Sequence, residues 1–154
     1  MTSASVNDIE FRSVTKLLDL VDQGDLWARH LFSQSQHDAQ SHLVGDRIKR
    51  QLALETSALA RPFYDRVVAE LAMTGSDLFV REGSDVTFVF RHRSADVFET
   101  QMKLYLDSAE KANRGAVRSR GEYLGVPYDH LTTPDRVVHV YSAAIEPDLH
   151  VRGN

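Results

Sequence analysis

The stretch Val86–Arg91, which reads V-T-F-V-F-R, consists of β-branched and aromatic residues up to its final arginine. Residues of these types favour a pleated, half-buried strand. A helical pattern follows at once, because Ser94 is a suitable N-cap and Gly115 a suitable stop. The apolar residues between these two recur at helical spacing: Phe98, Met102, Tyr105, Ala109 and Ala112. The sequence therefore predicts a strand followed directly by a helix over residues 94–114.

Three further strands are predicted after this helix, over residues 122–131, 137–144 and 149–152, with a proline-containing turn before each of the last two. A strand, a helix and then more strands are typical of a helix packed on one face of an antiparallel sheet. The last predicted strand ends close to Asn154. We therefore expect it to be unpaired, and we expect the chain to be a fragment of a longer polypeptide.

The first half of the chain has a different pattern. Four apolar residues fall on one helical stripe, namely Val14, Leu17, Leu18 and Val21, and a weaker helical pattern continues to Ala53. We therefore expect a flexible tail over residues 1–12, a helical segment over 13–65, and the sheet plus helix over 66–154, all in one compact domain. The predicted fold class is α+β: N-terminal helices followed by a mainly antiparallel sheet with one long helix packed on a face.

The composition excludes several classes of protein. The 154 residues are 42% apolar and 26% charged, which is ordinary for a globular domain. The absence of cysteine excludes disulfides, thiolate metal sites and a cysteine nucleophile. A net charge of −4 argues against nucleic-acid binding. The sequence shows no signal peptide and no transmembrane segment, so a cytoplasmic location is the default expectation.

Metal binding is the first chemical hypothesis, because the chain has seven histidines and no cysteine. His130, His139 and His150 fall on three consecutive predicted strands, and they would form a cup if all three faced one side of the sheet. Such a cup predicts a metal-dependent hydrolase. The alternative is that these are ordinary sheet-face histidines. A weaker metal candidate is the row Asp38, His42 and Asp46, which one helix face would share.

Anion binding is the second chemical hypothesis. Arg91 and Arg93 end the strongest predicted strand, and Arg118 and Arg120 precede the next one. If these strand ends were neighbours, four guanidinium groups could surround a phosphate or a segment of RNA. The alternative is that they belong to a solvated face.

Three segments resemble a family of large, functionally uncharacterised bacterial proteins. They are G-S-D-L-F-V-R-E-G-S-D-V-T-F-V-F at 75–90, T-T-P-D-R at 132–136 and E-P-D-L-H-V-R at 146–152. The resemblance implies that the chain is part of a polypeptide several times longer. It implies no activity, cofactor or catalytic residue.

Recognised catalytic motifs are absent from the sequence, which contains neither a G-x-S-x-G nor a G-x-x-x-x-G-K-[ST] pattern. We therefore expect a non-catalytic structural or protein-interaction module of a larger bacterial protein, and no cofactor. The expected partner is another protein or the remainder of the parent chain, with a homo-oligomer as a further possibility. The alternatives are the hydrolase, which would use a divalent metal, and the anion- or RNA-binding module.

Overall fold

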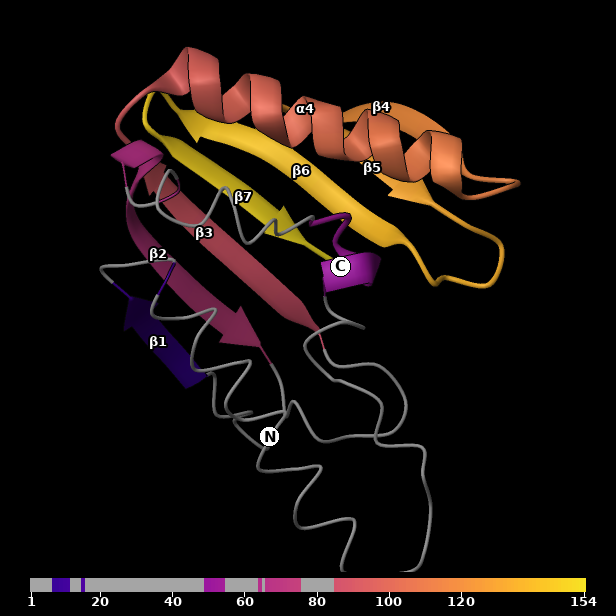
Figure 1. Cartoon of the computed structure of the whole chain (residues 1–154), viewed down its shortest axis with the longest axis horizontal. Coiled ribbons are helices and arrows are strands. Elements are labelled where there is room, and N and C mark those ends of the chain that lie inside the picture. Colours follow the sequence, from indigo (N-terminus) through magenta and orange to yellow (C-terminus); the bar gives the residue numbers. More distant parts are fainter. Residues whose placement is uncertain (1–6, 12–14, 16–48, 55–63, 65, 76–84) are drawn as a thin grey trace, which may run out of the picture.

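In a computed structural model of the chain, the structure describes residues 7–11, 15, 49–54, 64, 66–75 and 85–154. These residues form one antiparallel sheet with a long helix across one of its faces (Figure 1). Along the chain the elements are β1 (Asn7–Phe11), β2 (Val68–Gly75), β3 (Val86–His92), α4 (Ala95–Ala112), β4 (Val117–Tyr123), β5 (Val126–Thr132), β6 (His139–Glu146) and β7 (Leu149–Gly153). Their order across the sheet is β1-β2-β3-β7-β6-β5-β4.

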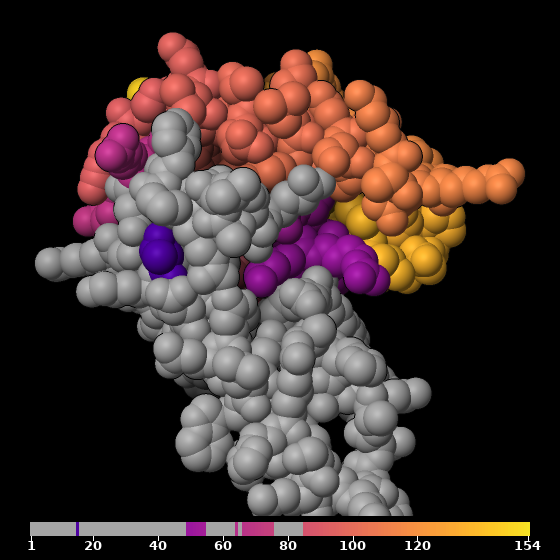
Figure 2. All heavy atoms as spheres, viewed as in Figure 1, coloured from indigo at the N-terminus to yellow at the C-terminus, as the bar shows by residue number. Residues whose placement is uncertain are grey.

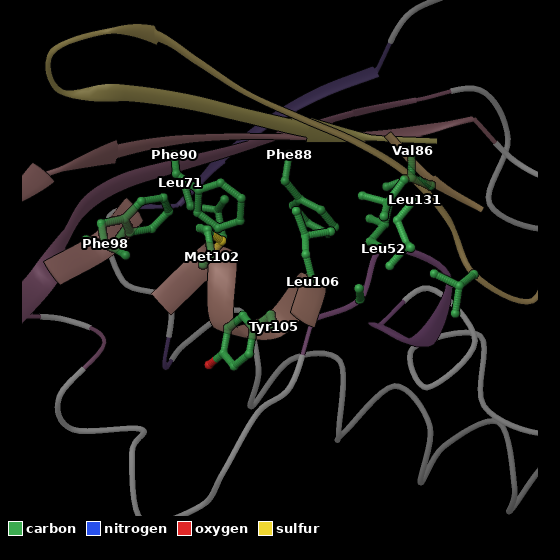
Figure 3. Packing of buried hydrophobic residues seen from close by; sticks show 14 residues of the cluster. Leu52, Leu71, Val86, Phe88, Phe90, Phe98, Met102, Tyr105, Leu106 and Leu131 are labelled. Carbon is green, nitrogen blue, oxygen red and sulfur yellow. The ribbon is translucent and has the colours of Figure 1, made fainter. Parts of the chain in front are cut away.

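The core lies between the sheet and α4 (Figure 3). Alternate residues of β3 are buried, because successive side chains of a strand point to opposite faces. The helix contributes Phe98, Met102, Tyr105 and Leu106 to this layer. The rings of Phe90 in β3 and Phe98 in α4 lie 5.3 Å apart, which is within the range of favourable aromatic pairs. The alternation in V-T-F-V-F-R therefore sets which face of the sheet the helix covers.

A short helical turn over residues 49–54 completes the core. Leu52 and Ala53 are both buried, and the backbone amide of Leu54 donates a hydrogen bond of 2.7 Å to the carbonyl of Lys49. In the space-filling view this turn lies beside the orange surface of α4 (Figure 2). Within the part of the chain that the structure describes, no helix is long and apolar enough to cross a membrane.

The predicted fold class is wrong at the start of the chain. Asn7–Phe11, placed in a flexible tail by the sequence, form β1 and pair with β2. Among the described residues of the predicted segment 13–65, residues 49–54 form a helical turn, Thr15 and Tyr64 are helical, and no complete N-terminal helix is found. The predicted stripe over residues 14–21 and the row Asp38, His42 and Asp46 lie outside the described residues.

Two strand predictions are also corrected. The single strand predicted over residues 122–131 is a hairpin, because Leu124 (φ 51°) and Gly125 (φ 81°) form a two-residue turn between β4 and β5. The final strand is not unpaired: β7 is hydrogen-bonded to β3 and to β6. The β6–β7 hairpin returns the chain to the free side of β3, so the end of the sequence lies in the middle of the sheet.

Candidate functional site

A chain of polar contacts crosses the helix-covered face of the sheet. Ser142 in β6 has its Oγ atom 2.9 Å from Nε2 of His150 in β7, and Nδ1 of His150 lies 2.8 Å from a carboxylate oxygen of Glu99 in α4. Ser142 and His150 are buried, and Glu99 is partly exposed. The same Glu99 oxygen lies 3.7 Å from Nε2 of buried His92. Two buried imidazoles therefore face one carboxylate at the surface of the core.

A buried cation continues this chain of contacts. Arg152 in β7 is fully buried, and its Nε donates a hydrogen bond of 3.3 Å to Oγ of Ser142. Burial lowers the pKa of Arg152 to about 10, while the negative charge of Glu99 acts in the opposite direction. The guanidinium and the Glu99 carboxylate are thus linked through one hydroxyl and one imidazole, which lowers the cost of burying the charge.

A groove of about 450 Å³ opens between α4 and strands β4–β7. Glu99, Ser142 and His150 all border it, so three members of the polar chain reach one wall of the groove, while Arg152 lies in the core behind them. Its remaining lining is mixed, with apolar residues such as Leu106 and charged residues such as Lys103. The volume falls in the range of small-molecule sites, roughly 300–1,000 Å³.

The opposite face of the sheet carries two of the three predicted metal ligands. Nε2 of His130 in β5 lies 3.4 Å from Nδ1 of His139 in β6, and the ring of Tyr141 stacks on His130 at 4.3 Å. Burial and the nearby positive charge of Arg136 hold the pKa of both histidines below the usual value. Both causes favour the neutral form of these imidazoles.

The structure does not bring the third predicted ligand to this pair. Ser142 and Tyr141 are successive residues of β6 and face opposite sides, so His150, which contacts Ser142, lies on the other face from His130 and His139. Among the described residues, no group of three or more histidine, aspartate or glutamate side chains could hold a metal ion. The condition for the predicted cup, that all three histidines face one side of the sheet, is therefore not met, and metal binding by this chain stays a prediction.

The four predicted anion-binding arginines are also apart. Strands β7, β6 and β5 separate β3, which carries Arg91, from β4, which carries Arg118 and Arg120. Arg91 pairs with Asp148 and Glu70, and both β4 arginines pair with Asp129. Arg93 follows β3, and its backbone amide donates to the carbonyl of Val67. The structure therefore does not gather these guanidinium groups around one anion.

The sequence reasoning missed Ser142 and Glu99. Glu99 was one polar residue within the helix predicted over residues 94–114, and Ser142 was one residue within the strand predicted over 137–144. The predicted pairing of the last two strands could have indicated the contacts of Ser142, since the β6–β7 hairpin places Ser142 opposite Arg152 and diagonal to His150. That register depends on the turn, and the contact of His150 with α4 depends on how the helix packs on the sheet.

The fold and the groove define a helix-covered antiparallel sheet with a serine–imidazole–carboxylate wall. No family model matches the chain, and no solved structure matches it. One similar protein is described as cytidylate kinase, from Borrelia turicatae (strain 91E135), with 30% identity over 110 residues. The matched region is 70% of this chain and 46% of that protein, so the chain spans about half the length of this relative.

Proposed function

We propose that this domain is a protein-interaction module of a larger bacterial protein, and that it pairs the open edge of β4 with β4 of a second copy of the chain. The observation that supports this is the position of β4. It ends the sheet and is hydrogen-bonded to β5 on one side, and most of its residues are exposed. In the described part of the chain no strand pairs with its other side. An edge of this kind is a template for another strand.

The sequence of β4 is self-complementary about its centre. In an antiparallel pair centred on Arg120, Val117 lies opposite Tyr123 and Arg118 lies opposite Glu122. Apolar–aromatic and opposite-charge pairs each stabilise a ladder by roughly 0.2–1 kcal/mol. Arg120 would lie opposite its own equivalent, but it is 76% exposed and already paired with Asp129, which reduces the repulsion. A two-fold symmetric contact of this type is the commonest route to a homodimer.

Sedimentation velocity of the chain over a range of protein concentrations tests this proposal. We expect a monomer–dimer equilibrium that Val117→Lys shifts to monomer, because a lysine on an edge strand opposes pairing. Leu104→Lys is the matched control, since Leu104 is an exposed leucine of α4 and should leave the dimer unchanged. A wild-type chain that stays monomeric at the highest concentration, or a dimer that Val117→Lys leaves intact, would overturn the proposal.

A second candidate function is nucleotide-kinase-like phosphoryl transfer, which only the likeness to a cytidylate kinase favours. The sequence contains no G-x-x-x-x-G-K-[ST] loop to hold a triphosphate. Incubation of the chain with cytidylate and ATP, followed by chromatography of the nucleotides, tests this candidate. Formation of the diphosphate in proportion to the protein would support it, and unchanged nucleotides would remove it.

A further inference from the structure

We infer that Ser142, His150 and Glu99 form a nucleophile, its general base and a positioning carboxylate for acyl transfer from a small carboxylic ester. This activity goes beyond the interaction proposed above, and it would replace the expectation of a non-catalytic module.

The directions of the hydrogen bonds follow from the chemistry of the groups. An ionised Glu99 carboxylate can only accept, so Nδ1 of His150 carries the proton and donates across 2.8 Å. The neutral imidazole then has an unprotonated Nε2, which accepts the hydroxyl proton of Ser142 across 2.9 Å. This is the tautomer in which an imidazole can take the proton of an attacking serine.

Arg152 favours the reactive form of the serine. Its Nε–H donates to Oγ of Ser142 at 3.3 Å, so a buried positive charge lies next to the serine oxygen and favours the loss of its proton to His150. Each member of the set belongs to a regular element, with Glu99 in α4, Ser142 in β6 and His150 in β7.

The groove sets the class of substrate. Its volume of about 450 Å³ suits a small molecule, and its lining combines apolar residues, among them Met102 and Leu106, with the cations of Lys103 and Arg120. We therefore assign a small ester whose acyl group contacts the apolar wall.

The reaction balances with water as the second substrate. Oγ of Ser142 forms a bond to the carbonyl carbon, and its proton moves to Nε2 of His150. The bond from the carbonyl carbon to the ester oxygen breaks, and the departing alcohol takes that proton. Water then attacks the acyl-serine with His150 again as base, which releases the carboxylic acid and restores the hydroxyl.

The experiment uses the full chain and an alkyl fluorophosphonate, which reacts with activated serines by losing fluoride. Peptide mass mapping locates the adduct on the wild-type protein, so this measurement does not depend on whether any variant folds. We expect the adduct on Ser142. Ser119 is the matched control, because its hydroxyl lies 3.5 Å from Nδ1 of His130, whose ring contacts are His139 and Tyr141 rather than a carboxylate. Its labelling should be slower by about 100-fold or more.

Variants at His150 and Glu99 separate catalysis from structure. His150→Gln should lower the rate of labelling at Ser142 by about 100-fold, which is the smaller end of the contribution of a general base. Glu99→Ala should lower it as well, and Glu99→Asp should restore part of the rate if Glu99 positions the imidazole. The inference is overturned if wild-type Ser142 stays unlabelled, or if His150→Gln reacts as fast as the wild type. Neither outcome depends on whether the chain dimerises through β4, so failure of the labelling test and failure of the sedimentation test can be told apart.

Discussion

Nη2 of Arg152 in β7 lies 2.9 Å from the carbonyl oxygen of Met102 in α4, so a fully buried guanidinium joins the helix to the sheet. Nη1 of the same side chain donates to the carbonyl oxygen of Ala53 at 3.2 Å. One cation thus connects β7, the helix and the turn over residues 49–54. Carbonyl oxygens and a serine hydroxyl replace the water that the guanidinium loses on folding, as a buried charge requires.

Removal of Arg152 should therefore destabilise the fold strongly. We expect Arg152→Ala to lower the free energy of unfolding by about 3 kcal/mol, because it leaves a cavity and unsatisfied carbonyl oxygens. Arg152→Met should cost less, since it keeps most of the volume and removes the need to bury a charge. Urea denaturation followed by circular dichroism measures both values. Equal stability of Arg152→Ala and the wild type would contradict the structural role given to this residue.

The strand β3 and the helix α4 could be predicted because each has a regular apolar period. The burial of Val86, Phe88 and Phe90 follows from their alternation, and that of Phe98 and Met102 from helical spacing. The place of β7 could not be predicted in the same way. The turn at residues 146–148 predicts that β7 pairs with β6. It does not predict that the other edge of β7 pairs with β3, because that pairing depends on which strands together bury one face of the sheet.

The candidate site was less predictable than the fold. Ser142, His150 and Arg152 are polar residues on the face of the sheet that packs against the core. The alternation of apolar and polar residues alone therefore does not predict that they are buried. Their contacts depend on a diagonal across β6–β7 and on Glu99, which approaches from a different element. The pairing of His130 with His139 was foreseeable from the turn between their strands, whereas the separation of His150 required the register.

The histidine pair should make stability depend on pH. The folded-state pKa of both His130 and His139 lies below the unfolded value, because of burial and the charge of Arg136. The unfolded chain therefore binds more protons than the folded chain, and stability present above about pH 6.5 is lost as the pH falls through the folded-state pKa values.

Thermal melts between pH 7 and pH 5 measure this dependence. The double variant His130→Gln, His139→Gln should lose less stability over that interval than the wild type, since its side chains at these positions do not titrate. A fall in melting temperature equally steep in both proteins would show that other groups cause it.

The carboxylate of Asp129 should also make stability depend on pH, in a more acidic range than the histidines. Burial alone would raise its pKa, but the hydrogen bond from Arg120 and the ion pair with Arg118 outweigh burial and hold the pKa below the usual value. Its contribution is present above the unfolded pKa and is lost as the pH falls through the folded-state value. We expect Asp129→Asn to cost about 1 kcal/mol at pH 7 and little at pH 2, a difference that urea titrations at the two pH values can resolve. An equal cost at both would contradict the ion pairing.

Leu124 offers a prediction in the stabilising direction. It is the first central residue of the β4–β5 turn, has a φ of 51° and is 87% exposed, so it adopts a left-handed conformation and buries almost nothing. Asparagine adopts this conformation at lower cost than leucine and is preferred at this position of a two-residue hairpin.

We therefore expect Leu124→Asn to raise the free energy of unfolding by roughly 0.5–1 kcal/mol. Leu104→Asn in α4 is the control, because the same change at an exposed helical leucine should lower stability slightly through its poorer helix propensity. Urea midpoints of the two variants against the wild type give the comparison. A loss of stability in Leu124→Asn would mean that the leucine side chain makes contacts that outweigh the strain of its backbone.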